Sequence, residues 1–309
     1  MPFEITSYDE LRRRGLTPGH VRTELQSGRL TRVCHAMYAP SAPLSPELHY
    51  DRLIEAQRHV LDGEGVISHF SAARILGWPV PRDRLDKLWV TRPGYGGGKS
   101  GAASVRHVHW MLGDDDVMML DGHAVTTPTR TLADLLRRLT FTQGVIVADA
   151  ALRSGVDRAA VDELLCTESR RWHTTLARRA LAFANPLAES PLESRSRVLM
   201  AEYDVPPPIL QMWFGNATEP IGRSDFGWLE ERVLGECDGK VKYGRELAPG
   251  GDPAEAVWRE KIREDRAREA NYSMVRWINA DFTNPDRLAV RWLHALGRPT
   301  DRLVRRRLG

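Results

Sequence analysis

The apolar and polar positions of the first forty residues predict two short helices followed by a β-ribbon. Residues 6–14 offer a helix-capping position with acidic residues directly after it, where the helix dipole favours them. A Thr-Pro pair starts a second helix over residues 17–26, with apolar positions four apart. Residues 29–38 then alternate with the period of two that strands require. This is the order of a winged helix-turn-helix, which we expect over residues 1–40.

The next part of the chain mixes helical and strand-like runs after a Pro/Ser-rich break at residues 40–46. Helical spacing and strand alternation predict helices near 47–61, 69–77, 128–139, 143–154 and 170–184, and strands at 87–91 and 105–110. The glycine-rich stretch at 94–101 lacks the spacing of a phosphate-binding P-loop, so we interpret it as a loop. We expect a mixed α/β middle domain over residues 41–185.

The last third predicts a helix that leads into a small sheet. An Asn-Pro pair at 185–186 marks its start. The patterns predict helices at 190–202, 254–271 and 285–296, and strands at 209–214, 223–229, 231–237 and 273–278. We therefore expect an α/β domain over residues 186–309. The fold class expected for the whole chain is α+β multidomain, with a winged helix-turn-helix, a mixed α/β middle region and a C-terminal α/β domain.

Composition indicates a globular protein with a substantial core. Of the 309 residues, 42% are hydrophobic and 28% are charged, and no apolar run approaches the roughly 18 residues of a membrane span. The start of the chain lacks the pattern of a signal peptide, so we expect a cytoplasmic location and no membrane partner. Three widely spaced cysteines exclude a disulfide framework and a zinc knuckle. The net charge of +3 is too small to argue for nucleic-acid binding by itself.

Two segments of the last third combine acidic residues in the way a metal site would. Asp225 begins a strand, and Glu236 and Asp238 lie on its predicted hairpin partner. Carboxylates on neighbouring strands can hold Mg²⁺ together with waters and phosphate oxygens, so these three are the candidate metal ligands. A nearby lysine would orient an attacking water. The candidate catalytic set is Glu193, Asp225, Glu236, Asp238, Lys240 and Lys261.

The same residues also fit a structural role. Asp238-Gly239 is a favoured two-residue hairpin turn whatever the function of a protein. The charged run that contains Lys261 and Asp265 is typical of a solvated helix face with i, i+4 ion pairs. Residue spacing alone therefore leaves the metal site and an ordinary hairpin both open.

The predicted winged helix supplies candidate DNA contacts. A recognition helix places its N-terminal side chains at base edges, so the start of the second helix is the expected reading surface. Arginines of the first helix and of the ribbon are candidates for phosphate contacts. The candidate set is Arg12, Arg13, Arg14, Thr17, His20, Arg22, Thr23, Arg29 and Arg32. The alternative is a mildly basic protein-docking domain.

Several residues of the last third recur in a known order. They are Glu193, Asp225, Glu236-x-Asp238-Gly239 and, after a charged helix, Val275-Arg276-Trp277. This order resembles the DUF559 domain, a very-short-patch-repair-like branch of the PD-(D/E)xK nuclease superfamily, over roughly residues 190–296. The resemblance implies a restriction-endonuclease-like fold, a site lined by the four acidic residues, and Mg²⁺ as cofactor if the site is active. The chain departs from the pattern because Asp238 replaces the expected lysine, for which Lys240, Lys242 or Lys261 could substitute.

The first two thirds of the chain contain a second set of short motifs. They lie at residues 27–33, 37–40, 68–73, 77–79 and 125–134. Their order resembles the AbiEi-type antitoxins of type IV toxin–antitoxin and abortive-infection systems, which act in phage defence. Similar proteins pair this antitoxin-like body with a DUF559 tail, so the resemblance spans nearly the whole chain. It implies operator binding and a cognate toxin, usually a nucleotidyltransferase-like protein.

Three functions follow as expectations. The leading one is a DNA-binding antitoxin and transcriptional autorepressor, with double-stranded DNA and a toxin protein as partners. The alternative is a metal-dependent DNA endonuclease directed by the winged helix. The third is an interaction protein in which the nuclease-like fold is only a scaffold.

Overall fold

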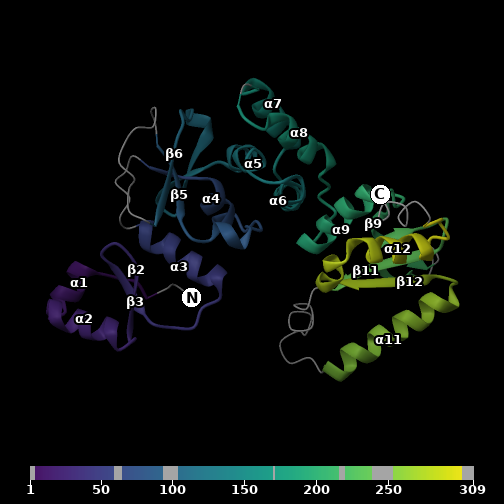
Figure 1. The fold of residues 1–309 in the computed structure, drawn as a ribbon, viewed down its shortest axis with the longest axis horizontal. Helices are drawn as coiled ribbons and strands as arrows, with labels where there is room; N and C mark the ends of the chain where they lie inside the picture. The colour runs from purple at the N-terminus through teal and green to yellow at the C-terminus, as the bar shows by residue number, and fades with distance from the viewer. Residues whose placement is uncertain are drawn as a thin grey trace. The chain divides into compact units, whose positions relative to one another are not determined.

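The computed structural model describes residues 4–58, 65–92, 104–169, 171–215, 220–238 and 253–300. The chain forms two compact units, Met1–Ala182 and Phe183–Gly309 (Figure 1). The described residues combine helices with three sheets, which is an α+β architecture. The first forty residues belong to the same unit as the middle region, and the division falls just before the Asn-Pro pair. None of the described helices has the length and apolar character needed to cross a bilayer.

The first unit begins with two helices beside a three-stranded antiparallel sheet (Figure 1). The elements are β1 (Thr6–Ser7), α1 (Tyr8–Arg13), α2 (Pro18–Gln26), β2 (Leu30–Cys34) and β3 (Met37–Pro40), with strand order β1-β3-β2. Ser7 caps α1 by accepting the backbone N–H of Glu10, at 3.1 Å. Leu11 of α1, Val21 of α2 and Tyr38 of β3 form the small buried core that joins the three parts.

The rest of the first unit is a five-stranded mixed sheet with helices. Its elements are α3 (Pro46–Arg58), β4 (Val66–Ile67), α4 (His69–Ile75), β5 (Leu88–Arg92), β6 (Val105–His109), β7 (Val117–Leu120), β8 (His123–Thr126), α5 (Pro128–Leu136), α6 (Phe141–Arg153), α7 (Arg158–Thr167) and α8 (Thr174–Phe183). The strand order is β6-β5-β4-β8-β7, with β4–β8 and β5–β6 parallel. Strand alternation in β5 sends Leu88 and Val90 into a cluster with Tyr50 of α3, while Trp89 contacts His69 on the other side.

The second unit has the order helix, three antiparallel strands, helix, parallel strand, helix. Its elements are α9 (Pro191–Glu202), β9 (Ile209–Gly215), β10 (Pro220–Trp228), β11 (Val233–Asp238), α11 (Pro253–Glu269), β12 (Ser273–Ile278) and α12 (Pro285–Ala295). The sheet order is β12-β11-β10-β9, and β12 runs parallel to β11. This is the helix-led sheet that the sequence predicts.

Two separate cores hold this sheet between its helices. Trp277 of β12 packs with Trp292 of α12 in the first core, and its indole N–H donates to Ser196 Oγ of α9 at 2.8 Å. The other face of the sheet carries Leu234, which packs with Ala267 of α11. Consequently α9 and α12 cover one face and α11 covers the other, and successive residues of β11 contact different helices.

Candidate functional site

All nine sequence-predicted DNA contacts lie on the surface of the α1–α2–hairpin part of the first unit. Thr17 begins α2, because its hydroxyl accepts the backbone N–H of His20 at 3.2 Å, and His20 Nδ1 faces the Thr17 N–H at 3.4 Å in return. These two side chains therefore fix the start of the helix. Arg22 and Thr23 follow on exposed positions of α2, and Thr23 Oγ1 donates to the Gly19 carbonyl at 3.1 Å.

The arginines of this surface are partly held by acidic neighbours. Glu10 lies 3.0 Å from Arg13 and 3.2 Å from Arg14. Arg29 makes a two-point pair with Glu24 at 2.6 and 2.8 Å, and this hydrogen bonding lowers the pKa of Glu24. These pairs are exposed, so each contributes little to stability and can be exchanged for phosphate contacts.

The remaining two arginines of this set contact backbone carbonyls. Arg12 Nη1 donates to Leu16 at 3.3 Å, and Arg32 Nε donates to Cys34 at 3.2 Å. Both side chains stay exposed, so their charge faces solvent beside α1 and at the hairpin.

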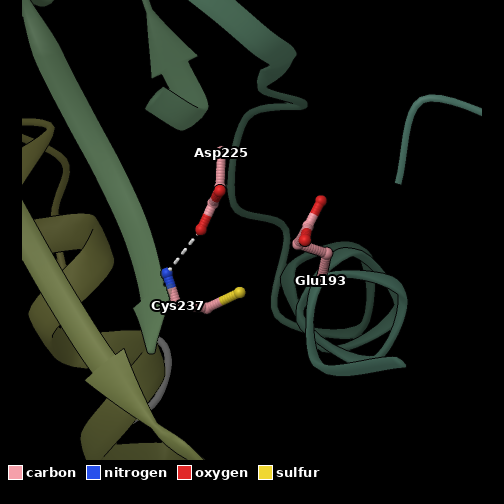
Figure 2. A group of neighbouring side chains, drawn as sticks. All are labelled: Glu193, Asp225 and Cys237. Carbon is pink, nitrogen blue, oxygen red and sulfur yellow. Dashed lines mark hydrogen bonds between the residues drawn. The ribbon is translucent and has the colours of Figure 1, made fainter. Parts of the chain in front are cut away.

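In the second unit, Glu193, Asp225 and Cys237 converge from three different elements (Figure 2). One ligand atom of each residue lies within 4.8 Å of the others. Asp225 Oδ2 accepts the backbone N–H of Cys237 at 3.0 Å, which ties β10 to β11 at this point. Glu193 and Cys237 are each only 1% exposed. The sequence predicted the two carboxylates of this group and missed the thiol.

Glu193 is fixed by the start of α9. Ser190 caps the helix by accepting the Glu193 N–H at 3.2 Å. Glu193 Oε2 in turn accepts the backbone N–H of Glu189 and the side-chain amide of Gln211, each at 2.8 Å. These two hydrogen bonds satisfy one oxygen of the buried Glu193 carboxylate and hold the side chain in one orientation. Gln211 is a second contributor that the sequence interpretation did not include.

Glu236 points away from this group. It faces the α11 side, because neighbouring strand residues alternate and Cys237 faces α9. There Glu236 Oε2 accepts Arg276 Nε at 3.1 Å, and Glu236 Oε1 pairs with Arg263 of α11. Both carboxylate oxygens of Glu236 are therefore engaged by arginines, and the carboxylate does not share the cluster of Glu193 and Asp225.

The other sequence-predicted site residues fall elsewhere. Asp238 ends β11, and its side chain is outside the described part of the structure, as is all of Lys240. Lys261 is exposed on α11, the helix that covers the Glu236 face. Lys261 therefore lies on the other side of the sheet from Cys237.

The donor set fits Mg²⁺ only in part. Glu193 and Asp225 supply the carboxylate oxygens that hard cations prefer. The thiol of Cys237 is a soft ligand and suits Zn²⁺ better than Mg²⁺. Among the described residues, the site therefore offers Mg²⁺ two carboxylates and no complete ligand set.

A third polar centre lies buried in the first unit and includes two residues of the motif at 125–134. Arg130 of α5 is 1% exposed and makes two-point contacts with Asp134, at 2.8 and 3.1 Å, and with Glu168, at 2.6 and 3.0 Å. Arg171 also contacts Asp134, at 2.9 Å. The sequence predicted a helix near residues 128–139, and the structure confirms it as α5, on which Arg130 and Asp134 lie four residues apart and form an ion pair. The ion pair with Glu168 was not predicted.

No protein-family model matches the chain. Two curated proteins of Mycobacterium tuberculosis are similar to it: uncharacterized protein MT2308 of strain CDC 1551 / Oshkosh and uncharacterized protein Rv2248 of strain ATCC 25618 / H37Rv. Each is 26% identical over 291 residues, which cover 92% of this chain and 98% of the relative. The similarity therefore extends over both units, and neither name states an activity.

Proposed function

We propose that this protein is a duplex-DNA-binding repressor whose reading surface is α2 with the β2–β3 hairpin. The observation that carries the proposal is that all nine candidate side chains of this surface are exposed, on a helix pair followed by a hairpin. In a winged helix the second helix enters the major groove and the wing follows the backbone. Arg22 and Thr23 are then the candidates for base contacts, and Arg12 and Arg32 for phosphates.

The resemblance to AbiEi-type antitoxins supports a more specific role. By it the protein would bind an operator near its own gene and antagonise a cognate toxin encoded beside it. Purification of the full chain together with the product of the adjacent reading frame tests the second part, because an antitoxin that acts by contact co-elutes with its toxin.

A titration with labelled duplex DNA from upstream of the gene tests the DNA-binding proposal. At about 50 mM salt the wild type should bind, and affinity should fall steeply as salt rises, because phosphate contacts release counterions. Arg22→Ala should cost about 1–3 kcal/mol on the preferred sequence, and Arg12→Ala should weaken all duplexes and reduce the salt slope by about 1. Arg268→Ala, an exposed arginine of α11, is the matched control. Absence of binding at low salt, or equal loss in the control, contradicts the proposal.

A second candidate function is metal-dependent DNA cleavage by the second unit. The observation that favours it is that the carboxylates of Glu193 and Asp225 lie close together. They are two of the four acidic residues that the nuclease resemblance implies. It predicts nicking of supercoiled DNA in Mg²⁺ or Mn²⁺ that is lost in Asp225→Asn and Glu193→Gln. Intact plasmid with both metals, under conditions where the protein is folded, would reject this function and leave the DNA-binding proposal untouched.

A further inference from the structure

Four arginines gather around the aromatic residues of the five-stranded sheet, and we call them the arginine shelf: Arg84, Arg106, Arg138 and Arg171. The guanidinium carbons of Arg106 and Arg138 lie 5.6 and 5.3 Å from the ring centroid of the same indole, Trp89. Arg171 stacks at 4.1 Å over Trp110. Arg84 lies 5.7 Å from the Phe70 ring, which itself contacts Trp89 edge-on at 5.0 Å.

The position of the shelf follows from strand register. Arg106 of β6 is the direct neighbour of Trp89 on β5, and β6 is the edge strand of the sheet. Arg138 lies just beyond the end of α5 and reaches the same ring. The indole of Trp89 therefore carries two cations in addition to its ring contacts with His69 and Phe70, and each cation–π contact holds an arginine in place without neutralising it.

The shelf has more positive than negative charge. Its acidic neighbours Asp134 and Glu168 are bound by Arg130 and Arg171, and Asp83 pairs with Arg84 at 3.3 Å. Within the described chain, neither Arg106 nor Arg138 has an ion-pair partner. Burial lowers the pKa of Arg138, and the like charges of Arg171, Arg106 and Arg84 lower it further against the opposing effect of Asp134. An arginine cluster held under mutual repulsion favours an anion as its missing partner.

An exposed indole follows this cluster directly in the chain. Trp172 comes next after Arg171 in the turn before α8 and is 84% exposed, more than any other large hydrophobic residue described. An exposed indole contributes no packing to the core. An exposed aromatic ring in the same chain segment as cations is a combination that single-strand-binding proteins use, because the ring stacks on a base and the cations bind phosphates. This second observation separates the shelf from a merely solvated charged face.

We infer that the arginine shelf and Trp172 bind single-stranded nucleic acid, with phosphates on Arg106 and Arg138 and an unpaired base on Trp172. Unpaired bases expose the flat faces that an indole stacks on, while bases within a duplex are already stacked. An acidic protein segment would pair with the arginines but has no base to stack on the Trp172 indole. The inference does not depend on DNA reading by α2, which lies in a different part of the unit.

Fluorescence anisotropy of the full chain with a labelled mixed-sequence single strand, as DNA and as RNA, tests this site. At about 50 mM salt the wild type should bind the DNA or the RNA single strand. An unlabelled duplex of the same sequence should not displace the labelled strand. Trp172→Ala should weaken binding about 5- to 150-fold, as loss of one stacked base does. Arg106→Ala with Arg138→Ala should weaken it at least as much and make the salt slope shallower by about 0.7 for each lost phosphate contact.

Matched controls come from the second unit. Trp213→Ala removes an indole that is 67% exposed, and Arg268→Ala removes an exposed arginine; both should leave affinity within about twofold of the wild type. The double variant Arg106→Lys with Arg138→Lys keeps both positive charges. Thermal unfolding of every variant checks that it is folded. Trp172→Ala retains the fold in any case because its side chain is in solvent.

Three results would overturn the inference. The first is absence of single-strand binding by the folded wild type, and the second is an equal loss of affinity in the Trp213 and Trp172 variants. The third is that poly-glutamate binds as tightly as nucleic acid and is insensitive to Trp172→Ala, which would identify the shelf as a surface for acidic proteins.

Discussion

The imidazole of His69 lies stacked on the indole of Trp89, with ring centroids 5.4 Å apart and planes 29° from parallel. His69 Nδ1 forms a hydrogen bond with Ser68 Oγ at 2.9 Å, and Nε2 has no hydrogen-bond partner among the described residues. The residue starts α4 with φ of 51°, a left-handed conformation that non-glycine residues rarely adopt. A neutral, strained and buried histidine thus lies beneath the arginine shelf.

This burial makes stability depend on pH. Burial lowers the pKa of His69 from 6.5 to about 4. A base whose folded-state pKa is depressed contributes stability above its unfolded pKa and loses that contribution as pH falls toward the folded value. We therefore expect about 3 kcal/mol of stability to disappear between roughly pH 6.5 and 4, measured by urea unfolding at a series of pH values.

The variant His69→Asn isolates this effect, because asparagine tolerates the left-handed conformation and does not titrate. Its stability at neutral pH is expected to be lower, since the ring contact with Trp89 is lost, but its slope between pH 6.5 and 4 should be shallower than that of the wild type. Identical slopes in the two proteins would show that His69 is not the titrating group.

The buried pair of Arg130 and Asp134 predicts a large mutational cost. Burial acts to raise the pKa of Asp134, but the charge interactions with His69, Arg130 and Arg171 hold it well below its usual range. Asp134→Asn removes one of the two carboxylates that make two-point contacts with Arg130, whose side chain is 1% exposed. Because Glu168 still pairs with Arg130, we expect a loss of about 3 kcal/mol in the free energy of unfolding, at the lower end of the cost of breaking a buried ion pair.

Glu47→Gln is the exposed counterpart, because its partner Arg82 is 78% exposed. It should cost less than about 1 kcal/mol. Replacing Arg130 and Asp134 together by apolar residues should cost less than the sum of the single changes, because no unpaired charge remains. Additive costs in that cycle would argue against direct coupling.

Gly235 of β11 makes room for the core tryptophan of the second unit. A Cβ at this position would lie 2.9 Å from Trp277 Cη2 and 3.1 Å from Phe226 Cβ. Gly235→Ala should therefore cost about 1–3 kcal/mol through overpacking. Gly113→Ala is the control, since its nearest neighbour would be 3.8 Å away, and an equal effect in both variants would reject the packing explanation.

The three cysteines should differ in reactivity. Cys34 and Cys237 are buried and Cys166 is exposed, and burial raises the pKa of Cys34 to about 11. In the folded protein one thiol should react with an aromatic disulfide reagent within minutes, and all three should react in denaturant. Cys166→Ser should remove the fast reaction, and rapid modification of Cys237 would contradict the buried position described for the acidic cluster.

Much of the fold was predictable because its elements carry strong local signals. The α2 start was visible as Thr17-Pro18, and the helix-led sheet of the second unit followed from periodicity. The β7–β8 hairpin was missed although Asp121-Gly122 is a favoured turn, with φ of 49° and 79°. The two-residue strand β4 has no periodicity to detect, and α7 was also missed.

The candidate metal site was less predictable, because the amino-acid sequence does not show which helix packs on each face of a strand. The sequence favoured Glu236 as a ligand, and alternation then places its neighbour Cys237 on the opposite face. Only the packing of α11 brings Arg263 to Glu236, and only the parallel pairing of β12 with β11 brings Arg276 to it. Both arginines are far from Glu236 in the sequence, so no local sequence pattern predicts these contacts.

The parallel pairing of β11 with β12 bears on how the chain is made. Val233 is paired with Ser273, so β11 remains an open sheet edge on the ribosome until the whole α11 crossover has been translated. The described strands of the first unit, β1 to β8, are complete by Thr126, long before that point. The nascent first unit can therefore fold while the second still exposes an unpaired strand, and chains cut short within α11 should be the aggregation-prone products of interrupted translation.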